Sequence, residues 1–331
     1  MSEKLKNFVF NKSADSDRPM LVALGGGTGL SFLLKGIKEL PLRITAVVTV
    51  SDDGGSSGKL RKEMQILPPG DIRNCLVALS QSESLMTKLF KFRFSEAGEL
   101  SGHSFGNIFI AAMTEILGDF GSAVREASNI LATRGTVIPV TCESVQLTAK
   151  FSDGTKITGE SAITGANKRI SEIVLEPADA LPNPEALNAI DQANLVVLGP
   201  GSLFTSVIPN LLVSDIAERI NRCSAPVVYV CNVMTQPGET DKYTAYDHVS
   251  AILEKTPLRR IDYVVVNSRR AARPIMLKYT AQGQNWVPPT VTKIEEKGIK
   301  VISGDYLVET DLLRHHPPSL ANTLFELISK A

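Results

Sequence analysis

The sequence lacks closely spaced cysteines: it has four in 331 residues, and no two form a C-x-x-C pair. Cys75, Cys142, Cys223 and Cys231 lie in separate apolar runs that resemble helices or strands. Zinc sites and disulfide frameworks show paired spacings, whereas single cysteines in apolar segments are typical of a reducing compartment. The pattern gives no support to a zinc centre and favours a cytoplasmic protein.

The sequence also has no formal net charge, because Lys plus Arg and Asp plus Glu both number 35. Proteins that bind DNA, RNA or an anionic membrane normally carry an excess of positive charge. We therefore expect neither a nucleic acid nor a membrane as a partner.

Long apolar runs are absent as well. Residues 1–18 lack the apolar core of a signal peptide, and no later stretch is long enough to span a bilayer. We expect 1–18 to be a flexible tail and 19–331 to form a single domain, and this pattern again favours the cytoplasm.

What the sequence does contain is an alternation of short apolar runs, rich in Val, Ile and Leu, with helix-length segments. Such runs are typical of buried parallel strands, and their alternation with helices predicts a doubly wound, mostly parallel α/β sheet. A weaker run at 299–303 is expected to close one edge of this sheet. The strand-like runs fall at 20–24, 44–50, 194–199, 227–232 and 263–268, and the helical segments at 30–39, 71–93, 104–117, 121–133, 211–222, 243–255 and 318–330.

One segment departs from this alternation. Between 137 and 176 the apolar period changes to two, on both sides of an Asp153-Gly154 pair. Alternating residues around a D-G turn predict an antiparallel hairpin. We therefore expect an inserted β-hairpin lobe at about 137–176.

A glycine turn, GGGTG at 25–29, joins the first apolar run to a predicted helix. Backbone amides at a helix N-terminus attract phosphate, and glycines allow a ligand to approach the backbone closely. The usual dinucleotide fingerprint needs glycine at the sixth position of the turn, where Leu30 stands. The turn therefore predicts a phosphate site that is not a standard NAD site.

An acidic pair, Asp52 and Asp53, follows the second apolar run in the loop SDDGGSSGKL at 51–60. This loop is not a Walker motif, because its first glycine is one residue too close to the Gly-Lys pair and Leu60 stands where Ser or Thr must contact magnesium. Carboxylates at this edge of a sheet can bind ribose, hold Mg²⁺ or act as a base, but adjacent aspartates also form plain turns. Both interpretations stay open.

Two further polar clusters precede predicted helices, PPGDIRNCL at 68–76 and GELSGHSFGN at 98–107. Asp71 is either a helix cap or a ligand contact, and Arg73 is suited to a bidentate contact with phosphate. His103 is the best acid or base candidate among the histidines, with a helix cap as the alternative. His315 and His316 are expected in a surface loop.

Polar residues also follow three later strands. They are the turn GPGSL at 199–203, Asn232 and Asn267. Parallel strands end at one edge of a sheet, so these residues are expected near the first glycine turn. Each is a candidate ligand contact or an ordinary strand terminator.

Six motifs together closely resemble the YvcK family, in the same order and over the chain from about Pro19 onward. They are GGGTG at 25–29, TVSDDGGSSGKLR at 49–61, PPGDIRN at 68–74, SGHSFGN at 101–107, GPGSLFTSVIPNLL at 199–212 and CNVMTQPGET at 231–240. The resemblance implies the YvcK and CofD-like superfamily and a Rossmann-like fold.

The two branches of that superfamily imply two functions. The YvcK branch is described as a gluconeogenesis factor, linked to carbon metabolism and cell shape, that binds UDP-N-acetylglucosamine. The CofD branch transfers 2-phospho-lactate from a guanosine diphosphate donor to a deazaflavin, with magnesium. Asp52 and Asp53 match the acidic loop of CofD, whereas the following GGSSGKLR matches YvcK. By resemblance, Tyr279 and Arg314 are further ligand contacts.

The leading hypothesis is thus a regulatory protein that binds a nucleotide sugar. The alternative is a CofD-like, magnesium-dependent transferase with a nucleotide diphosphate donor. A homo-oligomer and a regulatory protein partner are also expected. The expected catalytic residues are Asp52, Asp53 and His103, with Asp52 and Asp53 as Mg²⁺ ligands. The expected ligand contacts are Gly26, Gly27, Thr28, Gly29, Asp71, Arg73, Asn74, Ser104, Asn107, Gly201, Ser202, Asn232, Asn267, Tyr279 and Arg314.

Overall fold

A seven-stranded parallel sheet forms the centre of the protein, with the strand order β10-β9-β8-β7-β1-β2-β3. The computed structural model describes residues 17–81, 84–95, 98–309 and 313–330, so the expected tail at 1–18 lies outside the described residues except for Asp17 and Arg18. The strands are β1 (Met20–Gly25), β2 (Arg43–Val48), β3 (Thr136–Pro139), β7 (Leu195–Leu198), β8 (Val227–Val230), β9 (Tyr263–Asn267) and β10 (Lys300–Gly304).

The apolar runs of the sequence become strands that are covered on both faces. Leu21, Val22, Val197 and Val228, for example, are fully buried. Burial on both faces requires helices above and below the sheet, and the crossover connections supply them. The doubly wound, mostly parallel sheet is confirmed, and β10 closes one edge as expected.

The direction of the connections decides which helix covers which face. The link from β1 to β2 carries α2 (Gly27–Ile37), and the link from β7 to β8, which runs the opposite way along the sheet, carries η2 (Leu203–Val207), α10 (Ile208–Leu212) and α11 (Ile216–Arg222). Right-handed crossovers place these two sets on opposite faces. The strand order therefore reverses between β1 and β7, and open α/β sheets bind ligands at such a point.

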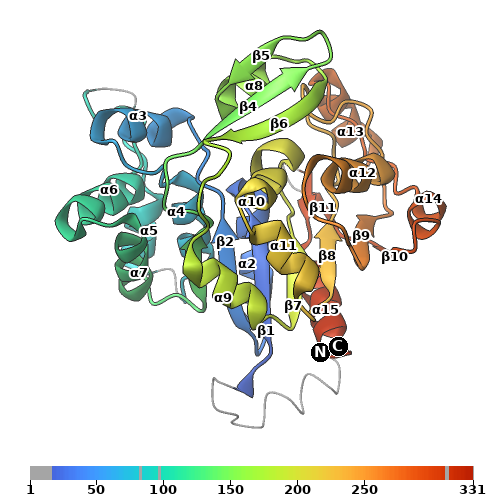
Figure 1. Ribbon diagram of the computed structural model, residues 1–331, viewed down its shortest axis with the longest axis horizontal. Helices are drawn as coiled ribbons and strands as arrows, with labels where there is room; N and C mark the ends of the chain where they lie inside the picture. Colours follow the sequence, from blue (N-terminus) through green and yellow to red (C-terminus); the bar gives the residue numbers. More distant parts are fainter. Residues whose placement is uncertain (1–16, 82–83, 96–97, 310–312, 331) are drawn as a thin grey trace.

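The helices between β2 and β3 form a layer of their own at one side of the sheet (Figure 1). They are α3 (Gly55–Met64), α4 (Gly70–Leu79), α5 (Leu85–Lys91), α6 (Phe105–Leu117) and α7 (Phe120–Ile130). The single helix expected at 71–93 is split in two at Ser80. There the backbone leaves the helix, bridges to Thr133 and accepts a hydrogen bond from Lys38 Nζ at 2.7 Å.

The expected helix at 211–222 is also divided, because Asp215 has a φ of +62° between α10 and α11. The remaining helices are α9 (Pro184–Asp191), α12 (Ala245–Lys255), α13 (Arg273–Ala281), α14 (Val291–Glu295) and α15 (Pro317–Ile328), and a small antiparallel pair is formed by β11 (Leu307–Glu309) and β12 (Leu313–His315).

An antiparallel sheet stands over the carboxyl ends of the central strands (Figure 1). This inserted lobe consists of β4 (Gln146–Phe151), β5 (Lys156–Thr158), β6 (Ile170–Glu176) and the short α8 (Glu160–Gly165), in the strand order β5-β4-β6. The D-G pair connects β4 to β5, with Gly154 at a φ of +85°. The structure differs from the expected lobe boundary, because the first apolar residues of 137–176 form β3, which pairs with β2 in the main sheet.

Close packing of α2 against α15 generates a test of the fold. A Cβ added to Gly36 would lie 2.5 Å from the Pro317 carbonyl oxygen. We expect Gly36→Ala to lower the free energy of unfolding by about 1–3 kcal/mol, because backbone must move to admit the methyl group. The matched control is Gly165→Ala in α8, where nothing lies within 4 Å of the added Cβ. Urea unfolding followed by circular dichroism measures both, and equal midpoints would contradict the packing.

Candidate functional site

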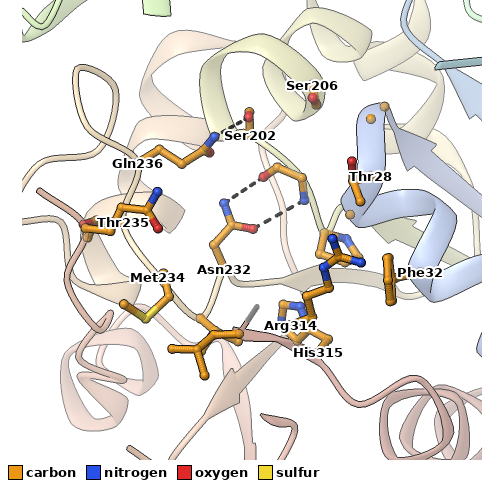
Figure 2. A pocket seen from close by; sticks show the side chains of 18 of the residues that line it. Thr28, Phe32, Ser202, Ser206, Asn232, Met234, Thr235, Gln236, Arg314 and His315 are labelled. Carbon is orange, nitrogen blue, oxygen red and sulfur yellow. Dashed lines mark hydrogen bonds between the residues drawn. The ribbon is translucent and has the colours of Figure 1, made fainter. Parts of the chain in front are cut away.

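A polar pocket of about 550 Å³ opens where β1, β7 and β8 end, and Glu160 of the inserted lobe lies on its wall. Figure 2 shows ten residues of its wall with their labels. Its position is the switch point of the sheet. The structure brings together eleven of the expected site residues on its walls: Gly26, Gly27, Thr28, Gly29, Asp52, Asp71, Gly201, Ser202, Asn232, Tyr279 and Arg314.

The first glycine turn is pressed against protein atoms on two sides. A Cβ on Gly29 would lie 2.6 Å from the Pro200 carbonyl oxygen, and one on Gly26 would lie 2.5 Å from an Asp71 oxygen. Gly27 has a φ of +61°, which favours glycine for conformational reasons. The contact with the second turn and the contact with Asp71 therefore both require glycine here, whether or not a ligand is bound.

Asp71 does not cap α4, whose N-cap is Pro69. Its carboxylate instead accepts a hydrogen bond from the Gly27 backbone amide, at the N-terminus of α2. A negative group at this position is favoured by the helix dipole. A phosphate that enters the pocket must therefore share the end of α2 with Asp71.

Three carboxyl groups face this end of the pocket: Asp52, Asp71 and, from α8 of the inserted lobe, Glu160. Burial and then the nearby Asp52 raise the pKa of Asp71 to about 7. Burial, followed by Asp71 and Asp52, raises the pKa of Glu160 to about 9. Near neutral pH, Glu160 thus carries a proton and Asp71 is close to its midpoint.

The second glycine turn is held in place by two amide side chains. Asn232 Nδ2 donates to the Gly201 carbonyl at 2.8 Å, and its Oδ1 accepts from the Gly201 amide at 3.4 Å (Figure 2). Gln236 Nε2 donates to Ser202 Oγ at 2.6 Å, while the buried Gln236 Oε1 has no partner among the described residues. Asn232 therefore shapes the pocket by holding the second glycine turn in position. Ser202, in that turn, lies on the pocket wall.

A further part of the pocket wall is made of aromatic and apolar side chains and one guanidinium. The Arg314 guanidinium lies over the Phe32 ring at 4.3 Å from its centroid, as Figure 2 shows. Tyr279 comes from α13 and its hydroxyl accepts a hydrogen bond from the Leu313 amide at 2.6 Å. Met234 also contributes to this wall. Phe32, Tyr279 and Met234 suit the flat face of a base or sugar better than a phosphate.

His315 is not a surface residue as expected, because only 9% of it is exposed and it lines the pocket. Its Nε2 lies 3.1 Å from the Cys231 carbonyl, which can only accept, so Nε2 carries the hydrogen and Nδ1 is an acceptor. Burial lowers the pKa of His315 to about 4. The ring is therefore neutral at physiological pH.

Asp53 points away from the pocket, although it follows Asp52 directly. Its Oδ1 accepts from the Ser161 amide at 2.9 Å, at the start of α8. A Cβ on Gly159, whose φ is +104°, would lie 2.4 Å from the other Asp53 oxygen. Asp53 therefore fastens the inserted lobe to the loop after β2, and this fastening places Glu160 at the pocket.

Six other expected site residues lie outside the pocket. Arg73 is bound by its neighbours, with Nη1 donating to Ser104 Oγ at 2.8 Å and Nη2 to Asn74 Oδ1 at 2.7 Å. His103 Nδ1 pairs with Ser56 Oγ at 3.2 Å, next to α3. The remaining two are Asn107, which is buried in α6, and Asn267, whose side chain bonds to Arg269 and Tyr306.

Sequence reasoning missed several residues of the pocket wall: Phe32, Glu160, Pro200, Ser206, Val233, Met234, Thr235, Gln236, Gln282, Gln284, Leu313 and His315. Val233 to Gln236 lie within the motif CNVMTQPGET at 231–240, so membership of that motif was a signal that could have identified them. Phe32 lies one turn into α2, and Glu160 arrives on the inserted lobe. Neither carries a local sequence signal.

The acidic end of the pocket offers Mg²⁺ a small number of protein ligands. Among the described ranges, no group of three or more His, Cys, Asp or Glu side chains is arranged to hold a metal ion. Asp52 and Asp71 supply carboxylate oxygens at one end, and Mg²⁺ commonly binds one or two carboxylates while phosphates and water complete its octahedron. The residues therefore fit Mg²⁺ in company with a phosphate ligand, with Asp71 in the place expected for Asp53.

A family model described as 2-phospho-L-lactate transferase CofD matches residues 21–307. The chain belongs to the CofD family. It is 45% identical over 314 residues to the gluconeogenesis factor of Bacillus subtilis, covering 95% of this chain and 99% of that protein. The gluconeogenesis factor of Halalkalibacterium halodurans is 47% identical over 92% of this chain and 95% of its own length.

A solved structure with high sequence identity has the same fold. It is a protein of the UPF0052 family from Bacillus halodurans, with a TM-score of 0.90 and 46% identity, and the match covers 93% of this chain and 99% of that one. The resemblance to the YvcK and CofD-like proteins is thus confirmed. In the part of the chain that the structure describes, no helix has the length and apolar character needed to cross a membrane.

The buried His315 generates a pH prediction. An unfolded histidine has a pKa of about 6.5, so between that value and about 4 the unfolded chain binds a proton that the folded ring does not. Stability should therefore fall as the pH is lowered through this window, by ~1.4 kcal/mol per unit for one histidine. His315→Gln removes this titrating group. The slope of unfolding free energy against pH should therefore be shallower by the contribution of one bound proton.

Urea unfolding between about pH 4.5 and 7.5 measures this slope. His248, another buried histidine whose pKa is lowered to about 4 by burial, is unchanged in both proteins and cancels from the difference. Parallel curves for wild type and His315→Gln would show that His315 is not held neutral.

Proposed function

We propose that this pocket binds a nucleotide sugar of the UDP-N-acetylglucosamine type and that the protein acts as a regulator through that ligand. One observation carries the proposal: two glycine turns, the end of α2 and the aromatic or apolar side chains Phe32, Tyr279 and Met234 line a single pocket of about 550 Å³. A pocket of this size accepts a ligand with a charged middle and a flat end.

The diphosphate is assigned to the glycine turns. The backbone amides of Thr28 and Gly29, at the N-terminus of the eleven-residue α2, favour an anion there. Gly201 and Ser202 face the same space from the second turn. Asn232 and Gln236 hold that turn still, and a rigid turn reduces the entropy lost when the ligand binds.

Charge is the main obstacle to an anionic ligand, because the pocket holds three carboxyl groups and one guanidinium, Arg314, within the described residues. The proton on Glu160 and the raised pKa of Asp71 remove part of that repulsion. A divalent cation between Asp52, Asp71 and the diphosphate would remove the rest. We therefore infer that magnesium strengthens binding.

Arg314 and Tyr279 are assigned to the base or sugar end. Arg314 already packs on Phe32, and this contact orients its guanidinium without a bound ligand. Gln282 and Gln284 bring amide groups to the same wall. Amides recognise the edge of a base or a sugar hydroxyl through paired donors and acceptors.

The name of most of the relatives, gluconeogenesis factor, supports a role in carbon metabolism. Regulation by a nucleotide sugar would connect such a role with the supply of cell-wall precursors and hence with cell shape. The cysteine pattern, which is typical of a reducing compartment, supports a cytoplasmic location for this role.

A second candidate is a CofD-like transfer of a phosphate-linked group, which the family match and the acidic end of the pocket favour. Magnesium would supply charge neutralisation for the diphosphate in such a reaction. Asp52 would hold it, and Asp71, with its pKa of about 7, is suited to accept a proton from an acceptor hydroxyl.

Binding is tested by calorimetric titration with UDP-N-acetylglucosamine, with and without Mg²⁺. We expect Arg314→Gln to weaken binding by about tenfold or more, because a charged hydrogen bond contributes roughly 1.5–3 kcal/mol. Arg270→Gln is the matched control, since Arg270 lies over Trp286 outside the pocket wall. No heat and no thermal shift at millimolar ligand would rule out the proposal.

Transfer is tested by incubating the chain with nucleotide diphosphate donors, Mg²⁺ and a hydroxyl acceptor. If the second candidate holds, nucleotide is released and Asp52→Asn abolishes the release, because its carboxylate faces the pocket. Asp53→Asn should keep most of it, since an amide oxygen can still accept from the Ser161 amide. Release that is equal in wild type and Asp52→Asn excludes this chemistry.

A further inference from the structure

A second cavity lies in the seam between α3 and the inserted lobe, which lie side by side in the upper part of Figure 1. We call it the seam cavity, and its volume is about 350 Å³. Arg61 and Lys62 line it from α3, whereas Gln146 and Thr158 line it from β4 and β5. No described residue lies on the walls of both the seam cavity and the pocket at the glycine turns, so the two cavities are separate.

The guanidinium of Arg61 is only partly satisfied by the protein. Its Nη2 donates to the Val145 carbonyl at 2.6 Å and to Ser144 Oγ at 3.2 Å. Its Nη1 is buried and has no hydrogen-bond partner among the described residues. Buried donors are nearly always paired, so an unpaired donor on a residue of the cavity wall indicates a missing acceptor.

The charge of Arg61 also lacks full compensation. Burial lowers its pKa, and the carboxylates of Asp53 and Asp52 offset only part of this effect. The guanidinium nevertheless stays protonated at physiological pH, because arginine titrates far above it. Lys62 adds a second cation to the described part of the cavity wall, where Asp53 is the single carboxylate. Water in the cavity can accept a hydrogen bond from Nη1 but does not balance this charge, whereas an anion does both.

The other side of the seam offers neutral hydrogen-bond donors. Gln146 brings a side-chain amide and Ser144 a hydroxyl. Two contacts already join the sides, because Arg61 bonds to Val145 just before β4 and Asp53 accepts from the Ser161 amide in α8. A ligand that accepts hydrogen bonds from both sides would add a third connection.

We propose that the seam cavity binds a small anion with carboxylate or phosphate oxygens, held by Arg61 and Lys62 on one side and by Gln146 on the other. A cavity of this size admits a small organic acid or a phosphate compound. The bound anion fastens the inserted lobe to α3. It therefore acts on the position of the lobe that brings Glu160 to the pocket at the glycine turns.

Calorimetric titration of the full chain with inorganic phosphate and, separately, with citrate tests this proposal at constant ionic strength. Binding of either anion supports it, and the better of the two identifies the oxygen chemistry. Arg61→Gln should weaken binding by about tenfold or more, because a charge-assisted hydrogen bond is lost. Lys62→Gln should weaken it by a few fold and keep the fold, since Lys62 is exposed. The matched control is Lys59→Gln, an exposed lysine of α3 outside the cavity wall, which should bind as wild type does.

Asp53→Asn gives a test of the opposite sign. It removes negative charge from the cavity wall, while its amide oxygen can still accept from the Ser161 amide, so the anion should bind a few fold more tightly. An anion that binds only at the glycine turns would bind equally to wild type, Lys62→Gln and Asp53→Asn, because both residues lie outside that pocket. Equal affinities would overturn the proposal.

Hydrogen exchange locates the bound anion independently. The anion should slow exchange of the backbone amides from β5 to α8, at 156–165, in wild type and not in Arg61→Gln. The proposal is overturned if neither anion gives heat at millimolar concentration, or if either binds without protecting these amides. None of these outcomes depends on nucleotide-sugar binding, because the titrations contain no nucleotide.

Discussion

The contact between two glycine turns is the constraint on which the rest of this structure depends. Gly29, at the start of α2, leaves no room for a Cβ beside the Pro200 carbonyl, so the ends of β1 and β7 are held at backbone distance. Because the chain reverses its direction along the sheet at these two strands, the same contact sets the floor of the pocket. Fold and site are therefore built on one piece of backbone packing.

The carboxyl groups complete this arrangement from outside the sheet. Asp71 bonds to the end of α2, Asp53 fastens α8, and α8 in turn brings Glu160 to the pocket. Buried acids that face one another raise the pKa of each, so these carboxyl groups are suited to hold a proton or a cation. The inserted lobe thus forms part of the pocket wall through Glu160.

The sequence predicted the sheet well, because strands buried on both faces must be continuously apolar, as β1 and β8 are. It predicted that the two glycine turns lie close together, because a glycine turn after an apolar run is visible in the local sequence and parallel strands end at one edge of a sheet. It could not separate Asp52 from Asp53, since neighbouring residues in a loop point in different directions. Arg73 and His103 lie outside this pocket, because they bond to Ser104 and Ser56, and their motifs say nothing of these partners. Glu160 lies at the pocket only because the inserted lobe packs there, and the local sequence does not indicate this packing.

A crystal structure of the chain with UDP-N-acetylglucosamine and Mg²⁺ tests the central claim most directly. The account predicts the diphosphate between Thr28 and Gly201, the cation on Asp52 and Asp71, and the base or sugar against Arg314 and Tyr279. Density for the diphosphate at any other place, such as beside Arg73 and His103, with the glycine turns free of ligand, would contradict it.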